Sequence, residues 1–247
     1  MPTEAVADLE LRAAVPTDLP AVAEVYVAAR AAAVPAMPAP VRPEAEVRAW
    51  VSGWDLSRHE TWVATSGGAV VGFASLTGDW LDSLYVLPGH ARGGVGSALL
   101  GVVMGLRPQG FSLWVFEQNQ PARAFYAAHG LLELESTDGS ANEERSPDLR
   151  VAWPGAEPLA FLRAQIDEVD DDLARLLARR VALTSAVQRH KPVAGQAGRD
   201  PEREHAIADR MARHAPALGA ARLQRIVHTI ITESLEVDAA ADGSEGS

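Results

Sequence analysis

The sequence of 247 residues contains no cysteine, which excludes disulfides and metal sites built from thiolates. Lysine is almost absent too, because Lys191 is the only lysine among the 22 basic residues. No uninterrupted apolar run reaches the length of a membrane span, and the start, MPTEAVADLE, lacks the basic and apolar regions of a signal peptide. We therefore expect a cytoplasmic protein that does not cross a membrane.

Positive charge is also in short supply. The formal net charge of -11 argues against non-specific nucleic-acid binding and favours small-molecule substrates. Any cluster of cations must then be local and placed to hold an anion.

Aromatic residues are missing from the last third of the chain. All six tryptophans and all three tyrosines lie before residue 154, and Phe161 is the only aromatic residue after it. This change in composition predicts two domains. We expect a first domain over 8–153, a linker over 154–158, a helical domain over 159–238 and a disordered tail over 239–247.

The first segment alternates between strand and helix patterns. Ser66, Gly67 and Gly68 form a turn signal between two strand patterns, and Thr17 with Asp18 is expected to cap a helix. The expected strands are 9–14, 61–65, 69–76, 81–87 and 111–116, and the expected helices are 17–33, 44–54 and 98–106.

A glycine-rich stretch follows the fourth strand, Arg92-Gly93-Gly94-Val95-Gly96-Ser97, and a helix pattern begins directly after it. Glycines let the backbone approach a ligand closely, and the free amides and dipole of a helix start attract a phosphate. In isolation the stretch fits a structural turn without a ligand equally well.

The fifth strand is followed by N-x-x-A-x-x-F-Y-x-x-x-G, from Asn119 to Gly130. With RGGVGSALL between two strands, this order resembles the GNAT acetyltransferase superfamily, which implies an α+β domain with a mixed sheet flanked by helices. The resemblance implies acetyl-CoA as co-substrate, with Asn119 on the cofactor arm and Tyr126 as the general acid for the departing thiolate. It also implies pyrophosphate binding by the amides of Arg92, Gly93, Gly94, Val95, Gly96 and Ser97, and pantetheine along Leu84, Tyr85 and Val86.

Ala91 departs from the family pattern, which usually has Gln or Arg at this position. The base for the acceptor amine stays open between Asp82, Glu117 and His90. Substrate identity is expected to depend on residues 34–54, whose specificity the sequence does not reveal.

The second segment begins with a long helix pattern that contains no glycine or proline until Pro192. Arg180 interrupts its apolar seam, and Lys191 continues the same helix face. Buried cations need either internal carboxylates or an anionic ligand, and both explanations are open at this point. The seam residues, in steps of three and four, are Leu159, Leu162, Ile166, Val169, Leu173, Leu176, Leu183 and Val187.

Two further helices are expected, over 201–214 and 220–237. Glu204 shares a face with Ile207 and Met211 on the first of them, and Ser234 follows the apolar face of the second. The residues expected to face inward on the last helix are Leu223, Ile226, Val227 and Ile230.

This segment resembles the all-helical chorismate mutase family over essentially its whole length. The matching residues are Arg163, Arg180, Lys191, Asp200, Arg203, Glu204 and Ser234, at the expected spacings. The resemblance implies that Arg180 holds one carboxylate of chorismate and that Arg163 of the partner subunit holds the other. It further implies that Lys191 contacts the ether oxygen, Glu204 accepts the substrate hydroxyl, Asp200 and Arg203 shape the pocket, and Ser234 contacts a carboxylate.

No metal or cofactor is expected for this reaction, because a pericyclic rearrangement needs a compact conformer and preorganised positive charge rather than a nucleophile. Asp238 stands where the family usually has Gln or Glu. An ionised carboxylate there would oppose the charge that develops on the ether oxygen, so reduced activity at neutral pH is expected.

We therefore expect a bifunctional enzyme, a homodimer through its helices, that converts chorismate to prephenate in aromatic amino acid biosynthesis and acetylates an unknown amine. Three helices of this length are expected to need a second chain to cover their seam. Two alternatives remain: the first domain is a non-catalytic CoA-binding sensor, or the helices only dimerise an acetyltransferase.

Overall fold

The computed structural model describes residues 8–190 and 200–244, and the side chains of residues 238–244 are outside this description. The chain divides into two compact units, Met1–Arg163 and Ala164–Ser247, each of which is described by itself. None of the helices in the described part of the chain combines the length and apolar character that crossing a membrane requires.

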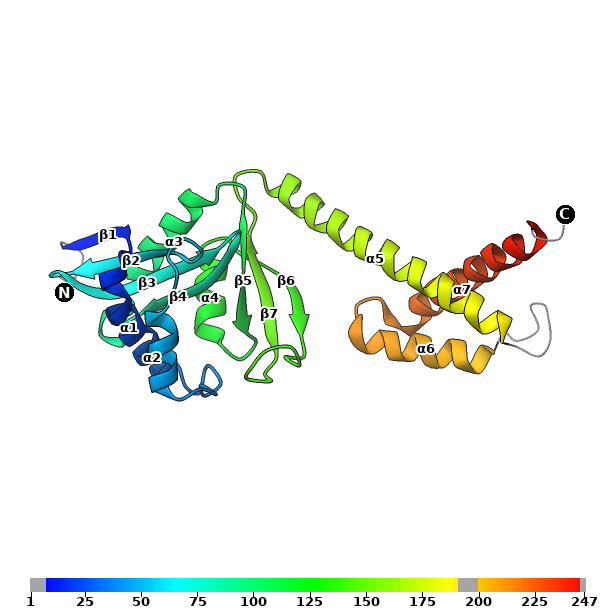
Figure 1. Ribbon diagram of the computed structural model, residues 1–247, viewed down its shortest axis with the longest axis horizontal. Coiled ribbons are helices and arrows are strands. Elements are labelled where there is room, and N and C mark those ends of the chain that lie inside the picture. Colours follow the sequence, from blue (N-terminus) through cyan, green and yellow to red (C-terminus); the bar gives the residue numbers. More distant parts are fainter. Residues whose placement is uncertain (1–7, 191–199, 245–247) are drawn as a thin grey trace. The chain divides into compact units, whose positions relative to one another are not determined.

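The N-terminal unit is built on one seven-stranded sheet with the order β1-β2-β3-β4-β5-β7-β6 (Figure 1). Every neighbouring pair is antiparallel except β4 and β5, which are parallel. The strands are β1 (Leu9–Ala13), β2 (Glu60–Ser66), β3 (Ala69–Thr77), β4 (Trp80–Val86), β5 (Phe111–Phe116), β6 (Leu132–Thr137) and β7 (Asp148–Trp153).

Helices pack on both faces of this sheet and create two apolar cores. Strand β3 shows the division, because Phe73 enters one core while Ala74 and Leu76 enter the other. The core around Phe73 contains residues of α1 (Leu19–Ala32) and α2 (Glu44–Ser52), and the other contains residues of α3 (Val95–Leu106) and α4 (Gln120–Ala128). This is the mixed sheet flanked by helices that the sequence predicts.

The expected elements of this unit form within a few residues of their predicted ends. Gly67 and Gly68 turn the chain between β2 and β3 with φ angles of 57° and 80°, a conformation that favours glycine. The prediction for Asp18 was wrong in detail: it stands at the start of α1, but its carboxylate accepts from the Val15 amide and from Arg12. Strands β6 and β7 were not predicted.

The C-terminal unit consists of helices α5 (Pro158–Arg189), α6 (Pro201–His214) and α7 (Gly219–Ser244), of which α5 begins before the unit boundary. Its buried apolar side chains within one chain are Ala208, Leu223 and Val227. Ile226 is 42% exposed, so its predicted inward position was wrong for a single chain.

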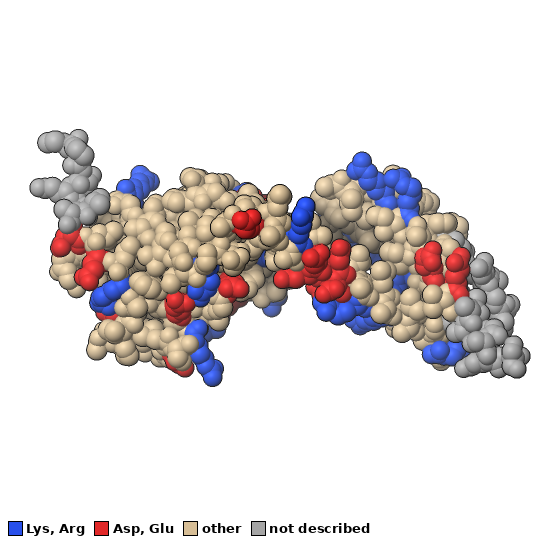
Figure 2. Space-filling model, turned by 90° about the horizontal axis from the view of Figure 1, so that it is seen from above, with Lys and Arg blue, Asp and Glu red and all other residues tan. Residues whose placement is uncertain are grey.

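Acidic and basic side chains lie in several separate groups on the face shown in Figure 2.

Two predicted boundaries of the helical unit move. The helix α5 starts at Pro158, inside the predicted linker, and proline is well tolerated in the first helical turn. The backbone of α7 continues as helix to Ser244, where the sequence analysis predicted disorder from residue 239. Three alanines at 239–241 favour this continuation because alanine has the highest helix propensity.

The apolar seam of α5 is not covered within one chain. None of the 32 residues of this helix is buried, and seven of its seam residues are largely exposed. These residues are Leu159, Ile166, Val169, Leu173, Leu176, Leu183 and Val187.

Candidate functional site

The glycine-rich stretch forms the start of α3, as predicted. Arg92 and Gly94 both adopt positive φ angles, 61° and 84°, and bend the chain into the helix that begins at Val95. The first amides of an α-helix have no carbonyl partner within the helix, and they carry the positive end of its dipole. Such a helix start suits a phosphate group. Of the amides predicted to bind it, that of Gly93 already donates to the His90 carbonyl oxygen at 3.4 Å, and the Ser97 hydroxyl lies 3.0 Å from Nε2 of His129.

Strand β4 has an edge that its neighbour leaves open. Strands β4 and β5 pair only at Trp80 and Ser112, whereas β5 pairs with β7 along its whole length. On its other side β4 pairs with β3 as far as Val86. The backbone of Leu84 to Val86 therefore has free hydrogen-bonding groups on the β5 side, where the sequence analysis placed the pantetheine arm.

Tyr126 of α4 is buried, and its burial raises the pKa of its phenol well above the usual range. Burial also raises the pKa of Tyr85 on β4, and the charges of Tyr26, Arg30, Tyr126 and Glu144 act on it as well. The charge of Tyr126 thus acts on the pKa of Tyr85, and both phenols remain protonated at neutral pH. A protonated phenol at this place is a proton donor.

Asn119 caps α4, because its Oδ1 accepts from the Ala122 amide at 3.2 Å. This contact uses one atom of the side chain and leaves Nδ2 as a donor. The residue predicted to contact the cofactor arm thus also fixes the start of the helix that carries Tyr126.

The three candidate bases lie on different elements. Asp82 accepts from Oγ1 of Thr77 at 2.6 Å, and loss of hydration raises the pKa of its carboxyl group. Nδ1 of His90 is buried and has no hydrogen-bond partner within the described part of the chain. Glu117 follows β5. All three remain candidates for the base.

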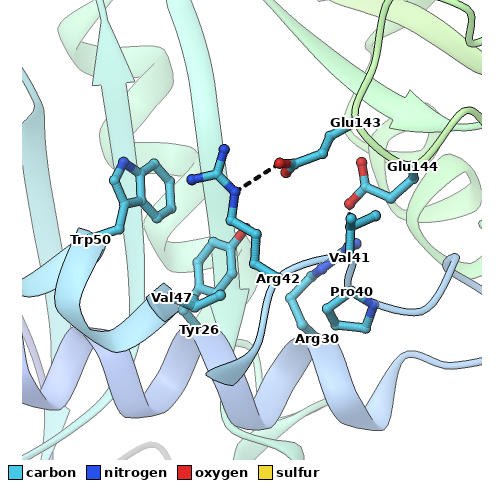
Figure 3. A pocket seen from close by; sticks show the side chains of 9 residues that line it. All are labelled: Tyr26, Arg30, Pro40, Val41, Arg42, Val47, Trp50, Glu143 and Glu144. Carbon is cyan, nitrogen blue, oxygen red and sulfur yellow. Dashed lines mark hydrogen bonds and ion pairs between the residues drawn. The ribbon is translucent and has the colours of Figure 1, made fainter. Parts of the chain in front are cut away.

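A pocket of about 180 Å³ opens on the α1 and α2 side of the sheet (Figure 3). Its walls come from α1, the loop before α2, α2 itself and the loop between β6 and β7. The lining residues are Tyr26, Arg30, Pro40, Val41, Arg42, Val47, Trp50, Glu143 and Glu144.

Two ion pairs close this pocket, and they differ in exposure. Arg30 contacts Glu144 at 2.6 Å, with side chains only 5% and 17% exposed. Arg42 contacts Glu143 at 2.7 Å, with side chains 52% and 48% exposed. Both pairs join the α1–α2 region to the β6–β7 loop.

The sequence analysis named residues 34–54 as the specificity region but missed Tyr26, Arg30, Glu143 and Glu144. The two consecutive glutamates at 143 and 144 were a signal for ion pairing, since α1 and the loop that follows it contain two arginines, Arg30 and Arg42. Nothing in a sequence pattern pairs residues that lie 101 and 114 positions apart.

In the helical unit, Arg180 of α5 points at α7. Its Nη1 donates to Oγ of Ser234 at 2.7 Å and to the Ile230 carbonyl oxygen at 3.3 Å. Ser234 is buried and donates in turn to the same carbonyl oxygen at 2.6 Å. Within the described residues Arg180 has no carboxylate partner. The inward cation of the sequence analysis is therefore held by neutral acceptors.

Glu204 lies on α6 with a largely buried carboxylate, 3.5 Å from Nδ1 of His228 on α7. Asp200 is the N-cap of α6, since its Oδ1 accepts from the Arg203 amide at 3.0 Å. Asp200 and the side chain of Arg203 are exposed, so within one chain they lie at the rim of the helices rather than in an enclosed pocket.

Three predicted site residues do not join this cluster. Lys191 and the side chain of Asp238 lie outside the described residues. Arg163 is exposed on α5. It precedes Arg180 by 17 residues, which corresponds to about 25 Å of rise on a continuous helix.

Comparison with known proteins agrees with the fold of the N-terminal unit. Residues 25–131 match the model of the acetyltransferase (GNAT) family. A peptidyl-lysine N-acetyltransferase, YiaC from Escherichia coli (strain K12), is 31% identical over 105 residues, which cover 42% of this chain and 70% of that protein. The chain belongs to the GNAT acetyltransferase family. Its GNAT domain contains the α3 start, the open edge of β4 and Tyr126.

One solved structure supports the fold of the N-terminal unit. The apo form of YjaB from Escherichia coli is 23% identical with a TM-score of 0.50, and the match covers 60% of this chain and 99% of that one. A GCN5-related N-acetyltransferase from Rhodopseudomonas palustris is 27% identical with a TM-score of 0.47, over 60% and 96% of the two chains.

The helical unit matches a second family. Residues 162–239 match the model of chorismate mutase type II, so this GNAT protein also contains a chorismate mutase domain. Both domains belong to families of enzymes. The resemblances derived from the sequence are confirmed for both halves of the chain.

Proposed function

We propose that the helical domain converts chorismate to prephenate. The observation that supports this most is Arg180, a half-buried guanidinium that contacts neutral oxygens rather than a carboxylate in the described residues. A cation in such a place favours an anionic ligand. Both of its contacts use Nη1, so Nη2 and Nε remain for a carboxylate, which a guanidinium can hold through two parallel bonds.

The residue roles follow the reaction's needs. A pericyclic rearrangement is accelerated by holding the substrate in a compact form and by stabilising the charge that grows on the ether oxygen. We assign the first task to Arg180 and to Arg163 of the partner subunit, and the second to Lys191. Glu204 would accept the substrate hydroxyl. Ser234 donates to Ile230 in this structure, so its first effect is to orient Arg180.

The exposed seam of α5 supports a homodimer as the active form. A helix of 32 residues with an apolar stripe and no buried residue is not stabilised by its own chain. A second copy presents the same stripe, which makes the two surfaces self-complementary. It would also bring its Arg163 to Arg180, which one continuous helix keeps apart.

The test is the loss of chorismate absorbance with the purified full-length protein. We expect turnover that Arg180→Ala and Lys191→Arg each reduce at least tenfold, the latter because a planar guanidinium replaces a compact ammonium. Arg175→Ala is the matched control, since Arg175 is an exposed α5 arginine paired with Asp172. No turnover by the wild type would leave the helices as a dimerisation module.

For the N-terminal domain, we propose acetyl transfer from acetyl-CoA to an amine. The open edge of β4 supports it, because the same domain also presents the amides at the start of α3 and the buried, protonated phenol of Tyr126. Acetyl-CoA would supply the acetyl thioester. The α3 amides would hold its phosphates, and the backbone of Leu84 to Val86 its amide-containing arm.

Tyr126 would act as the general acid. The neutral amine nitrogen attacks the carbonyl carbon, so a C–N bond forms while the C–S bond breaks, and the amine nitrogen loses one proton to water. The Tyr126 phenol gives its proton to the departing sulfur and regains one from water. Its raised pKa keeps that proton available at neutral pH.

The measurement is release of the CoA thiol with a panel of amines. The relative from Escherichia coli is a peptidyl-lysine N-acetyltransferase, so a lysine-containing peptide belongs in this panel. We expect thiol release that Tyr126→Phe reduces at least 100-fold while CoA binding, measured by calorimetry, is kept. CoA binding without thiol release for any amine would favour the sensor alternative.

A further inference from the structure

The pocket in Figure 3 carries an inference about the acceptor, which rests on the acetyltransferase activity proposed above. We infer that this pocket binds a free α-amino acid with an apolar side chain as the acceptor. Arg42 would hold its carboxylate, and the apolar wall around Trp50 would hold its side chain.

The inner end of the pocket is close to the open edge of β4. Tyr26 lines the pocket and packs edge-on against Tyr85 of β4, with ring centroids 4.9 Å apart. Tyr85 is in turn an electrostatic neighbour of Tyr126. A small ligand in the pocket is therefore near the place where the acetyl group would be transferred.

The two ion pairs differ in how easily a ligand can replace them. A buried pair is costly to break, because a charge is left without water or a partner. The Arg30–Glu144 pair is of this kind, and Arg30 also lies over the ring of Phe116 at 5.7 Å. The Arg42–Glu143 pair is half exposed, and such pairs contribute little. It is therefore the pair that exchanges with a charged ligand.

A zwitterion suits this exchange. Its carboxylate can take the place of Glu143 on Arg42 through two parallel bonds, and the released Glu143 can accept its ammonium group. No charge is then left unpaired. Tyr26 lines the same pocket as this ion pair, Glu143 raises the pKa of its phenol, and the phenol raises the pKa of Arg42.

The rest of the lining is apolar and the space is small. Trp50, Val41 and Val47 offer carbon surface beside the exchangeable pair (Figure 3). The pocket holds about 180 Å³, and a second hollow of about 280 Å³ shares five of its lining residues, Tyr26, Arg30, Pro40, Arg42 and Val47. Space of this order suits a small molecule such as one amino acid.

The same loops argue against a peptide. An extended chain needs a groove that is open at both ends, yet two contacts that do not exchange with the ligand join the α1–α2 region to segments that follow β5 and β6. One is the buried Arg30–Glu144 pair, and the other is a hydrogen bond from Gln118 Nε2 to the Pro35 carbonyl oxygen at 3.3 Å. A lysine within a peptide also lacks the free α-carboxylate that would pair with Arg42.

The experiment compares acceptors that differ only in the carboxylate, using the full-length protein, acetyl-CoA and thiol release. The pairs are L-leucine with isoamylamine and L-phenylalanine with phenethylamine, and a lysine-containing peptide is the third class. We expect kcat/KM at least tenfold higher for each amino acid than for its amine. Arg42→Gln should remove this preference by raising the KM of the amino acids at least tenfold.

Arg48→Gln is the matched control, because Arg48 is an α2 arginine paired with Glu24 and Glu44 outside the pocket. It should keep the preference. Amines or the peptide turned over as well as the amino acids would overturn the inference while acetyl transfer stands.

If no acceptor is turned over, calorimetric titration of L-leucine into the CoA-bound protein separates the two ideas. If L-leucine binds and Arg42→Gln weakens this binding at least tenfold, the pocket binds amino acids but the proposed acetyl transfer is rejected. Absence of binding would reject the ligand class as well.

Discussion

Leu173 tests whether a second chain covers the α5 seam. In one chain its side chain is 49% exposed, so about half of it remains available to a partner. Truncating a buried leucine to alanine costs about 2–5 kcal/mol, and the half that a partner would cover accounts for about 1–2.5 kcal/mol. Both copies carry the change, so Leu173→Ala should weaken the dimer by about 2–5 kcal/mol. At about 1.4 kcal/mol for each factor of ten, this is roughly 30-fold to several thousand-fold in Kd.

The assay follows association and activity over the same dilution series. Sedimentation velocity gives the monomer–dimer midpoint, and chorismate turnover gives specific activity at each concentration. Because Arg163 of the partner subunit is proposed to complete the site, activity should fall at the concentration at which the dimer dissociates. Leu132→Ala is the control, since Leu132 is a similarly exposed leucine on β6 and lies in the other unit.

The reasoning is refuted if Leu173→Ala leaves the midpoint within threefold of the wild type. It is refuted equally if the wild type is a monomer with full mutase activity at high dilution. In a monomer, this substitution should remove only the contacts that the same chain makes with the covered half of the side chain, about 1–2.5 kcal/mol of folding stability.

Three further outcomes are expected. Arg180→Ala should lower the mutase kcat about 100-fold, or about 3 kcal/mol, with unchanged circular dichroism, and a loss below threefold would remove Arg180 from the site. Burial raises the pKa of Tyr126, so ionisation of this phenol should not lower the acetyltransferase kcat up to about pH 10. A fall in kcat below pH 9 that is absent in Tyr126→Phe would contradict this. The hydrogen bond from Arg12 lowers the pKa of Asp18. The Asp18 carboxylate therefore stabilises the folded state above the ordinary aspartate pKa, and this stabilisation is lost as the pH falls below about 4. Asp18→Asn should therefore reduce the free energy of unfolding by about 1 kcal/mol at pH 7 but not near pH 2. Urea titrations at both pH values measure this difference. An equal loss at both pH values would contradict the prediction.

Local signals explain the parts of the fold that were predicted. The turn at Gly67 and Gly68 and the helix start at Gly94 are encoded by neighbouring residues, because the backbone there needs positive φ angles. Strand β6 lacks such a signal: it is an edge strand, and most of its side chains are exposed. Its pairing with β7 depends on a non-local contact, which local periodicity does not reveal.

The α5 seam shows a different limit. Its period of three and four residues predicted which side chains require an apolar partner, and Arg180 was predicted on the same face. The pattern does not reveal whether that partner belongs to the same chain. In one chain the seam is exposed, while Arg180 alone reaches across to Ser234.

The cofactor site and the acceptor pocket differ in how much of each could be predicted from the sequence. The reason is that one uses backbone groups of neighbouring residues and the other uses side chains from distant segments. The α3 start and the edge of β4 use backbone groups, and the glycine pattern together with the resemblance to the GNAT superfamily was enough to propose them. The acceptor pocket uses side chains from α1, the loop before α2 and the loop between β6 and β7. Its specificity depends on which arginine is left exposed beside its glutamate. Burial distinguishes Arg42 from Arg30, and burial is a property of the assembled fold. The residues most important for choosing a substrate are thus the ones that local sequence patterns describe least.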